Sequence, residues 1–264
     1  MPELPDVEGF RRRLDDCGRG RRVADVEVLD SAILRGVSAR RLTSELTGRR
    51  LGAPWRHGKW LLAPTDGGPT LGWHFGMTGS LLCDTEHEEP HRHDRLLLTL
   101  DDGVRLHYRD QRKLKGVSWL REGEVEQLLD GLGPDASDVT RAELADALAG
   151  RRGTVKGALM NQSVLAGLGN LLSDEVLWRA RIDPHTPARD LDADAARTLH
   201  GAMRRTLRTS VRAGRVPPRH SWLTGRRDEP EPTCPRCGRR LETARMSGRR
   251  TVWCPHCQTQ PVRA

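Results

Sequence analysis

The sequence has few lysines, few aromatic side chains and no long apolar run among its 264 residues. Because a membrane-spanning helix needs about 20 consecutive apolar residues, we expect no insertion into a membrane. The first ten residues, MPELPDVEGF, carry acids where a secretory signal would carry lysine or arginine. The sequence therefore predicts a protein that stays in the cytoplasm.

Basic charge is carried almost entirely by arginine and is concentrated near the C-terminus. Lysine accounts for only four of the 44 basic residues. Residues 201–264 hold fifteen arginines and four acids, although the formal net charge of the whole chain is only +8. A basic segment on a nearly neutral body indicates a polyanionic partner, most often nucleic acid. The alternative is an arginine-rich surface that contacts only water.

Hydrophobic periodicity divides the chain into parts of different structure. Apolar residues recur at helical spacing over residues 5–17, whereas residues 22–120 contain short runs typical of strands, with a hairpin turn at Asp101–Gly103. The second half is helical in pattern, and helices are predicted from Asn170 to Arg181 and over residues 191–213. The layout is thus β-rich first and helical afterwards.

Four cysteines near the C-terminus have the spacing of a structural zinc site, C-x2-C-x16-C-x2-C. They are Cys234, Cys237, Cys254 and Cys257. Four thiolates in two close pairs can surround one Zn²⁺ ion tetrahedrally, and so small a module needs the metal to fold. Disulfides are the alternative, which a cytosolic location disfavours. Cys17 and Cys83 have no such spacing and are expected to be ordinary thiols.

Five sequence blocks, in this order, resemble the formamidopyrimidine-DNA glycosylase/endonuclease VIII family. They are PELPDVE at 2–8, HGKWLL at 57–62, HFGMTGSL at 74–81, NQ with VLAGLGN at 161–170, and GRRT at 248–251. Each block alone is a weak signal, but five in the family's order are specific, and they cover essentially the whole chain.

The resemblance implies an α+β multidomain fold. A β-sandwich with a short N-terminal helix would occupy residues 1–121, a helix–two-turn–helix domain residues 122–226, and a zinc hairpin residues 227–264. The implied enzyme is a bifunctional base-excision-repair DNA glycosylase and AP lyase, which excises oxidised or ring-opened bases and nicks the strand by β/δ-elimination. Its partner would be damaged double-stranded DNA, bound by a monomer in the bacterial cytoplasm or nucleoid.

Three residues are implied in catalysis. Pro2, made N-terminal by removal of Met1, would attack C1′ of the deoxyribose through its secondary amine and form an iminium ion. Glu3 would shuttle protons, and the alternative for it is an acid favoured at the start of a helix. Lys59, at the tip of a hairpin, would bind a phosphate beside the lesion, and the alternative is a solvated turn lysine. The family usually has glutamate at the position of Asp6, so a supporting role there is less certain.

Three further residues are implied in filling the space that an everted nucleotide leaves in the duplex. Met77 would be the first wedge residue, Arg112 would contact the orphaned base, and Leu114 would add an apolar wedge where the family often has phenylalanine. The alternative for Met77 is simple core packing.

The phosphates that flank the lesion are implied to bind elsewhere. Asn170 opens its predicted helix, where exposed backbone N–H groups can hold an anion and the side-chain amide adds a donor. Arg249 would complete this clamp from the zinc hairpin. Lys156, just before the helix–two-turn–helix motif, matches a family lysine and is the third implied DNA contact.

Two alternatives to this enzyme stay open. One is a catalytically weak DNA-binding relative, although such a protein would be expected to lose Pro2, Glu3 or Lys59. The other is a glycosylase for an unusual bulky lesion.

Residues 214–225 are short where formamidopyrimidine-DNA glycosylases have a long loop that folds over everted 8-oxoguanine. We therefore predict weak excision of 8-oxoguanine and better excision of oxidised pyrimidines, ring-opened purines or further-oxidised guanines.

Overall fold

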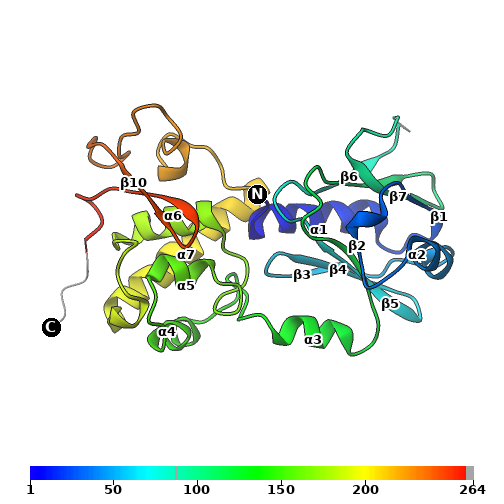
Figure 1. Ribbon diagram of the computed structural model, residues 1–264, viewed down its shortest axis with the longest axis horizontal. Helices are drawn as coiled ribbons and strands as arrows, with labels where there is room; N and C mark the ends of the chain where they lie inside the picture. Colours follow the sequence, from blue (N-terminus) through cyan, green and yellow to red (C-terminus); the bar gives the residue numbers. More distant parts are fainter. Residues whose placement is uncertain (87–88, 260–264) are drawn as a thin grey trace. The chain divides into compact units, whose positions relative to one another are not determined.

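The computed structural model describes residues 1–86 and 89–259, and the chain divides into two compact units (Figure 1). The first unit consists of residues 1–2 and 6–130, and the second of residues 3–5 and 131–264. Each unit has its own core of buried apolar side chains. The predicted α+β fold, with sheets first and helices afterwards, is confirmed.

Every helix among the described residues is too short or too polar to span a lipid bilayer.

Two sheets that share one core make the first unit a β-sandwich. Their strand orders are β1-β7-β8-β6 and β2-β9-β5-β4-β3. The strands are β1 (Val23–Val28), β2 (Leu34–Arg35), β3 (Trp55–His57), β4 (Trp60–Thr65), β5 (Gly68–His74), β6 (Ser80–Asp84), β7 (Asp94–Leu100), β8 (Arg105–Arg109) and β9 (Gly116–Leu120). Trp73 of one sheet and Tyr108 of the other lie in the same core. The predicted turn at Asp101–Gly103 joins β7 to β8.

The helices of the first unit are α1 (Leu4–Gly18), α2 (Ala39–Leu46) and α3 (Glu124–Asp130), with a short 3₁₀ turn at Ser31–Ile33. The prediction of α1 is confirmed, whereas α2 lies within residues 22–120, for which the sequence predicts strands. The sequence does contain signals for α2. The side chain of Ser38 caps its first turn, and Leu42 and Leu46, four residues apart, both face the core.

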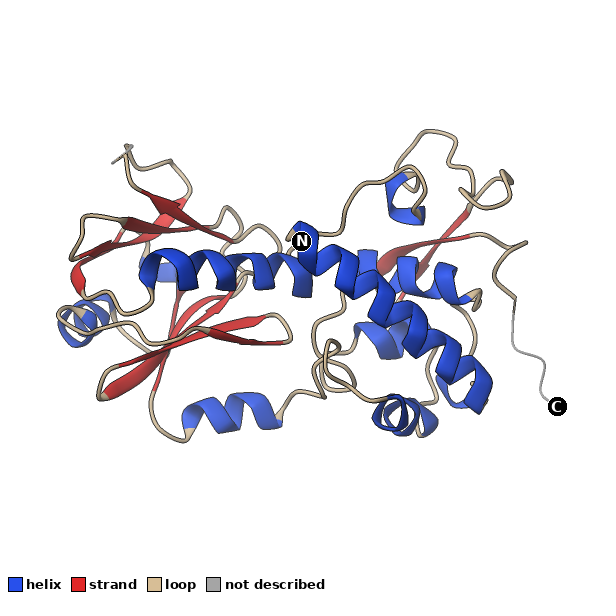
Figure 2. Cartoon of the chain, turned by 180° about the vertical axis from the view of Figure 1, so that it is seen from behind, coloured by secondary structure: helices blue, strands red, loops and turns tan. Residues whose placement is uncertain are grey.

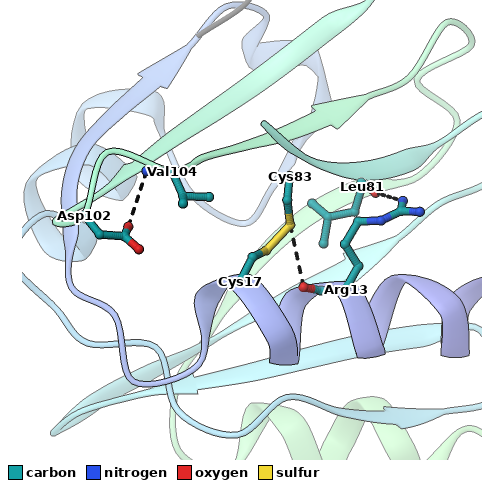
Figure 3. The surroundings of a disulfide bond; sticks show 6 residues. All are labelled: Arg13, Cys17, Leu81, Cys83, Asp102 and Val104. Carbon is teal, nitrogen blue, oxygen red and sulfur yellow. Dashed lines mark hydrogen bonds between the residues drawn. A yellow bond between two sulfur atoms is a disulfide. The ribbon is translucent and has the colours of Figure 1, made fainter. Parts of the chain in front are cut away.

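A disulfide bond joins Cys17, near the end of α1, to Cys83 in β6 (Figure 3). The expectation that both residues are unpaired thiols is therefore wrong. Their separation of 66 residues gives no local spacing to recognise, and only the packing of α1 beside β6 brings the two Cα atoms within 6.7 Å. In the same place Arg13 of α1 donates a hydrogen bond to the carbonyl oxygen of Leu81 (2.6 Å).

The second unit consists of helices and one hairpin. Its elements are α4 (Arg141–Ala149), α5 (Val155–Met160), α6 (Asn170–Ala180), α7 (Ala193–Ala213), the hairpin β10 (Glu242–Met246) with β11 (Arg249–Trp253), and 3₁₀ turns at Ala188–Asp190 and Leu223–Gly225. Helices α6 and α7 confirm the two helices predicted from periodicity.

Helix boundaries in this unit follow from capping residues. Asp192 caps the start of α7, the longest described helix (Figure 2), and Gly214 ends it in the left-handed conformation. Helix α6 is buried on nearly every side, since eight of its eleven residues are buried. It is therefore the central helix of the unit, and polar groups on it must find partners inside the protein.

Candidate active site

The side chain of Glu3 is buried against the N-terminus of α6. Its carboxylate accepts hydrogen bonds from the backbone N–H groups of Gly169 (2.8 Å), Leu171 (2.8 Å) and Leu172 (3.1 Å). A Cβ atom on Gly169 would lie only 2.4 Å from Cδ of Glu3, so the close approach requires glycine. A helix N-terminus offers unpaired N–H groups and the positive end of the helix dipole, and both stabilise a carboxylate there.

This contact changes the role expected for the N-terminus of α6. Exposed N–H groups were expected to hold a DNA phosphate, but three of them bind Glu3, so that expectation is wrong for these groups. The side chain of Asn170 is different. Its amide oxygen is buried and makes no hydrogen bond within residues 1–86 and 89–259. A phosphate accepts hydrogen bonds, so only the NH₂ group of this side chain, and not its oxygen, could donate to one.

Lys156 is fully buried, and its ammonium group does not face solvent. Nζ donates to Oδ1 of Asp174 on α6 (2.5 Å) and to Oγ1 of Thr251 on β11 (2.7 Å). The guanidinium of Arg227 binds the other oxygen of Asp174 (2.5 Å). This placement supports an indirect role for Lys156, in which it fastens α5 and the zinc hairpin to α6, rather than a direct contact with DNA.

Strand β11 exposes Arg249 to solvent. Its guanidinium makes no hydrogen bond or ion pair within the described part of the chain. The neighbouring Arg250 is engaged, because it binds the carboxylate of Asp228 (2.5 Å) and the carbonyl oxygen of Arg227 (2.7 Å). Arg245 and Arg249 line a concave surface of the hairpin. Arginine side chains exposed on such a surface can bind phosphate.

The four predicted zinc ligands converge at the base of the hairpin. Their Sγ atoms all lie within 4.8 Å of one another, and the pairs Cys234–Cys257 and Cys237–Cys254 are 3.9 and 3.6 Å apart. A tetrahedral zinc site with Zn–S bonds of 2.3 Å has S–S edges of about 3.8 Å, so the four sulfur atoms fit one zinc ion. The backbone N–H groups of Arg236 and Cys257 donate to the sulfur atoms of Cys234 and Cys254 (3.4 Å each), as suits thiolates.

Lys59 lies in the two-residue turn between β3 and β4, as the sequence predicted. Gly58, the other turn residue, has φ +56°, which glycine adopts most readily. Its carbonyl oxygen accepts a hydrogen bond from Arg56 (3.0 Å). The hairpin therefore fixes the backbone from which Lys59 extends.

His74 connects this hairpin to the loop that follows β5. Its ring lies edge-on against Trp60, with centroids 5.0 Å apart, and its Nδ1 accepts the N–H of Gly76 (3.1 Å). Burial, with help from the positive charges of Lys115 and Lys59, lowers the pKa of His74 to about 4. The ring is therefore neutral near pH 7 and can act as this acceptor.

The three predicted wedge residues lie on two loops of the first unit. Met77 is partly exposed and is not among the core residues, so the alternative of simple core packing does not apply. Its Sδ accepts a hydrogen bond from Nη1 of Arg112 (3.0 Å). Leu114 is 49% exposed, and a Cβ atom on Gly76 would lie 3.5 Å from its Cβ. The two loops thus abut and hold exposed apolar side chains.

Known proteins resemble this chain along its whole length. Three family models match: the formamidopyrimidine-DNA glycosylase N-terminal domain at residues 1–117, the formamidopyrimidine-DNA glycosylase H2TH domain at 131–219, and the zinc finger found in FPG and IleRS at 232–260. The formamidopyrimidine-DNA glycosylases of Roseiflexus sp. and Bacillus subtilis are 36% and 33% identical over 98% of this chain and 100% of their own. The chain belongs to the formamidopyrimidine-DNA glycosylase family.

Solved structures of this family have the same fold. The Lactococcus lactis enzyme, bound non-covalently to DNA containing an AP site, is 26% identical with a TM-score of 0.86. A MutM complex with DNA containing carbocyclic 8-oxoguanine is 27% identical with a TM-score of 0.89. Each match covers 98% of this chain and 100% of the other.

The family assignment confirms several predictions. The protein is a base-excision-repair DNA glycosylase, AP lyase activity is typical of its family, and the four cysteines form a structural zinc site. The recognised family, the fold class, the enzyme class and the zinc ion were all predicted correctly.

Sequence reasoning missed several residues that organise the site. Asp174 binds both Lys156 and Arg227. Neither Asp174 nor Arg227 belongs to a recognised block, and a buried acid looks in a sequence like an exposed one. His74 had a signal, because it opens the HFGMTGSL block.

Proposed function

We propose that the protein removes oxidised bases through Pro2 once Met1 has been cleaved off. The proline nitrogen attacks C1′ of the deoxyribose, so that a C1′–N bond to the protein forms while the bond from C1′ to the base breaks and the base leaves with a proton. The C1′–O4′ bond then breaks, O4′ takes up a proton, and the lone pair of the proline nitrogen forms the C1′=N bond of an iminium ion, which withdraws electrons. Loss of a C2′ proton then expels the 3′ phosphate, and a second elimination expels the 5′ phosphate.

In this scheme Glu3 carries protons to the opening sugar ring and away from C2′. The observation that supports it best is the anchoring of Glu3, the residue that follows Pro2 in the sequence. Its carboxylate is held by three backbone N–H groups at the start of α6. A general acid or base must be positioned before its proton affinity matters. Lys59, Asn170 and Arg249 would bind the phosphates around the everted nucleotide, and Met77, Arg112 and Leu114 would fill the space it leaves.

Borohydride reduction tests this scheme. Reduction of the iminium ion should link the protein to abasic or lesion DNA through Pro2, and the quantity trapped should fall in Pro2→Gly, which offers only a primary amine. Glu3→Gln should slow strand cleavage at an abasic site by at least about 100-fold. Glu27→Gln, at an exposed position of β1, is the control and should behave as the wild type. Unchanged trapping in Pro2→Gly, or in protein that retains Met1, would contradict the assignment.

The preferred lesion is a second part of the proposal, and the loop between α7 and the zinc hairpin supports it. Thr224 donates its N–H and its hydroxyl to the carboxylate of Glu175 on α6 (3.0 and 3.2 Å). Trp222 is buried under the guanidinium of Arg179, 4.2 Å from the ring centroid, and Leu223 lies in the core of the zinc hairpin. The loop is therefore fixed to the helical unit at three successive residues.

Such a loop is a poor lid for an everted purine. Each hydrogen bond to a charged group contributes about 1.5–3 kcal/mol, so releasing the loop from Glu175 would be costly. Alignments to the curated relatives span 275 to 282 positions, against 264 residues here, which is consistent with shortened segments in this chain. We therefore propose that oxidised pyrimidines, ring-opened purines or further-oxidised guanines are better substrates than 8-oxoguanine opposite cytosine.

Single-turnover excision on matched duplexes that differ only in the lesion tests this preference. Thymine glycol and formamidopyrimidine should be removed faster than 8-oxoguanine, while cleavage of a preformed abasic site should be robust. Equal rates for 8-oxoguanine and the other lesions would overturn the argument from the loop.

We also propose that the protein acts as a monomer on damaged double-stranded DNA in the bacterial cytoplasm or nucleoid. The exposed Arg249, together with the excess of arginine after residue 200, supports a DNA partner. Light scattering after size-exclusion chromatography should give the monomer mass with and without a lesion duplex, and a dimer mass would contradict the proposal.

A further inference from the structure

A single buried carboxylate joins the two loops that carry the wedge residues. Asp110 lies between β8 and β9 and is fully buried. Its Oδ1 accepts hydrogen bonds from the hydroxyl of Thr78 (2.6 Å) and from the N–H of Arg112 (3.1 Å). Its Oδ2 accepts the hydroxyl of Tyr108 (3.2 Å). Thr78 directly follows Met77, so Asp110 is hydrogen-bonded to both loops at once.

Thr78 reinforces this connection. Its hydroxyl oxygen also accepts the N–H of Arg112 (3.0 Å), so the N–H of Arg112 is shared between Thr78 and Asp110. On the solvent side, the guanidinium of Arg112 reaches Sδ of Met77. The backbone of Arg112 is therefore tied to Thr78, the residue that follows Met77, through one hydroxyl and one carboxylate.

The charge on Asp110 makes these contacts strong. A buried carboxylate without hydrogen bonds would be very unfavourable, and among the described residues its side chain is held by hydrogen bonds rather than by an ion pair. Burial and the neighbouring charge of Asp110 raise the pKa of Tyr108, which keeps that hydroxyl a donor. Losing one of these hydrogen-bond donors therefore leaves the buried carboxylate of Asp110 with fewer hydrogen bonds and loosens both loops.

We propose that Asp110 and Thr78 are positioning residues that hold Met77 and Arg112 in the arrangement needed to fill the space left by the everted nucleotide. The inference rests on the wedge role assigned under the proposed function. It adds that excision from duplex DNA depends on a hydroxyl and a carboxylate that touch neither the base nor the sugar.

The test compares duplex DNA with single-stranded DNA. Thr78→Val keeps the shape of threonine but removes its hydroxyl, and we expect excision from a lesion duplex to slow by at least about tenfold, the equivalent of about 1.4 kcal/mol. Thr78→Ser keeps the hydroxyl and should stay within about twofold of the wild type. Asp110→Asn should resemble Thr78→Val. Cleavage of a single-stranded abasic oligonucleotide needs no wedge and should change by less than about twofold in all three variants.

Matched controls come from the same unit. Thr65→Val removes a buried hydroxyl bond to the carbonyl oxygen of Pro69 (2.7 Å), and Asp94→Asn removes a buried carboxylate bound to Arg109 (2.7 Å). Neither bond joins the wedge loops, so both variants should keep the wild-type ratio of duplex excision to single-strand cleavage. A 2-aminopurine placed opposite the lesion should report reduced wedge insertion in Thr78→Val and normal insertion in Thr65→Val.

The outcomes separate this inference from the proposed function. If Met77→Ala slows duplex excision but Thr78→Val and Asp110→Asn do not, the positioning role is wrong while the wedge stands. Equal slowing of duplex and single-strand reactions in Thr78→Val also overturns the positioning role, because it indicates general damage. If Met77→Ala itself has no effect on duplex excision, the wedge assignment fails and the positioning role fails with it.

Discussion

Replacing Asp174 by asparagine is expected to destabilise the second unit by about 3–5 kcal/mol. The carboxylate lies between two buried cations, Lys156 and Arg227, at 2.5 Å from each, and it also accepts the N–H of Val252 (3.2 Å). Burial raises the pKa of Asp174 and lowers that of Lys156, while the attraction between the charges opposes both shifts. Asparagine keeps the shape and can still accept from Val252, but it leaves two buried cations without a counter-charge.

The cluster of Lys156, Asp174 and Arg227 has two positive charges and one negative charge, so a second variant is informative. Lys156→Met removes one cation and leaves Asp174 paired with Arg227, so its cost should be smaller than that of Asp174→Asn, even though both remove a 2.5 Å contact. A protein with a total stability of about 5–15 kcal/mol should show the difference clearly.

Thermal unfolding followed by circular dichroism measures the effect, with zinc release recorded by a chromogenic chelator. Asp174→Asn should lower the midpoint by about 10 °C and release zinc at a lower temperature, because the cluster fastens β11 to α6. A loss below about 1 kcal/mol would refute the reasoning, as would a larger loss for Lys156→Met than for Asp174→Asn.

Three further predictions concern the zinc hairpin and the sandwich. Cys237→Ser should release the zinc ion and abolish DNA binding, while the β-sandwich still melts near its normal temperature. Metal analysis and differential scanning calorimetry would measure this, and equal destabilisation of both units would contradict it. Arg249→Ala should retain zinc and weaken DNA binding about equally for duplexes of different sequence, with a smaller salt dependence in titrations, whereas a loss confined to one sequence would indicate base readout. The neutral form of His74 is favoured in the fold, since its pKa falls from 6.5 to about 4, so its contribution is complete above pH 6.5 and is lost as the pH falls toward 4. Urea unfolding should show that the wild type loses up to about 3 kcal/mol more than His74→Asn between pH 7 and pH 4, and parallel losses would contradict the assignment.

The sequence by itself determined the features that depend on neighbours along the chain. The periodicity that predicted α6 and α7, the turn at Asp101–Gly103 and the spacing within each cysteine pair all reflect residues two to four positions apart. Side chains at those separations meet whenever the local structure forms, so a pattern of residue types is enough to indicate them. The family blocks extended this to the enzyme class, because they name residue types at fixed positions.

Only the tertiary structure decided which distant groups meet. Glu3 binds N–H groups 166 to 169 residues away, Asp174 binds Arg227 across 53 residues, and Cys17 bonds to Cys83 across 66. Before folding, nothing distinguishes Asp174 from the exposed acids of the same chain. Its partner is fixed by the packing of α6 at the centre of the second unit, where burial makes an unpaired charge too costly to remain. Local spacing encodes the elements, and the cost of burying polar groups then decides how those elements must be joined.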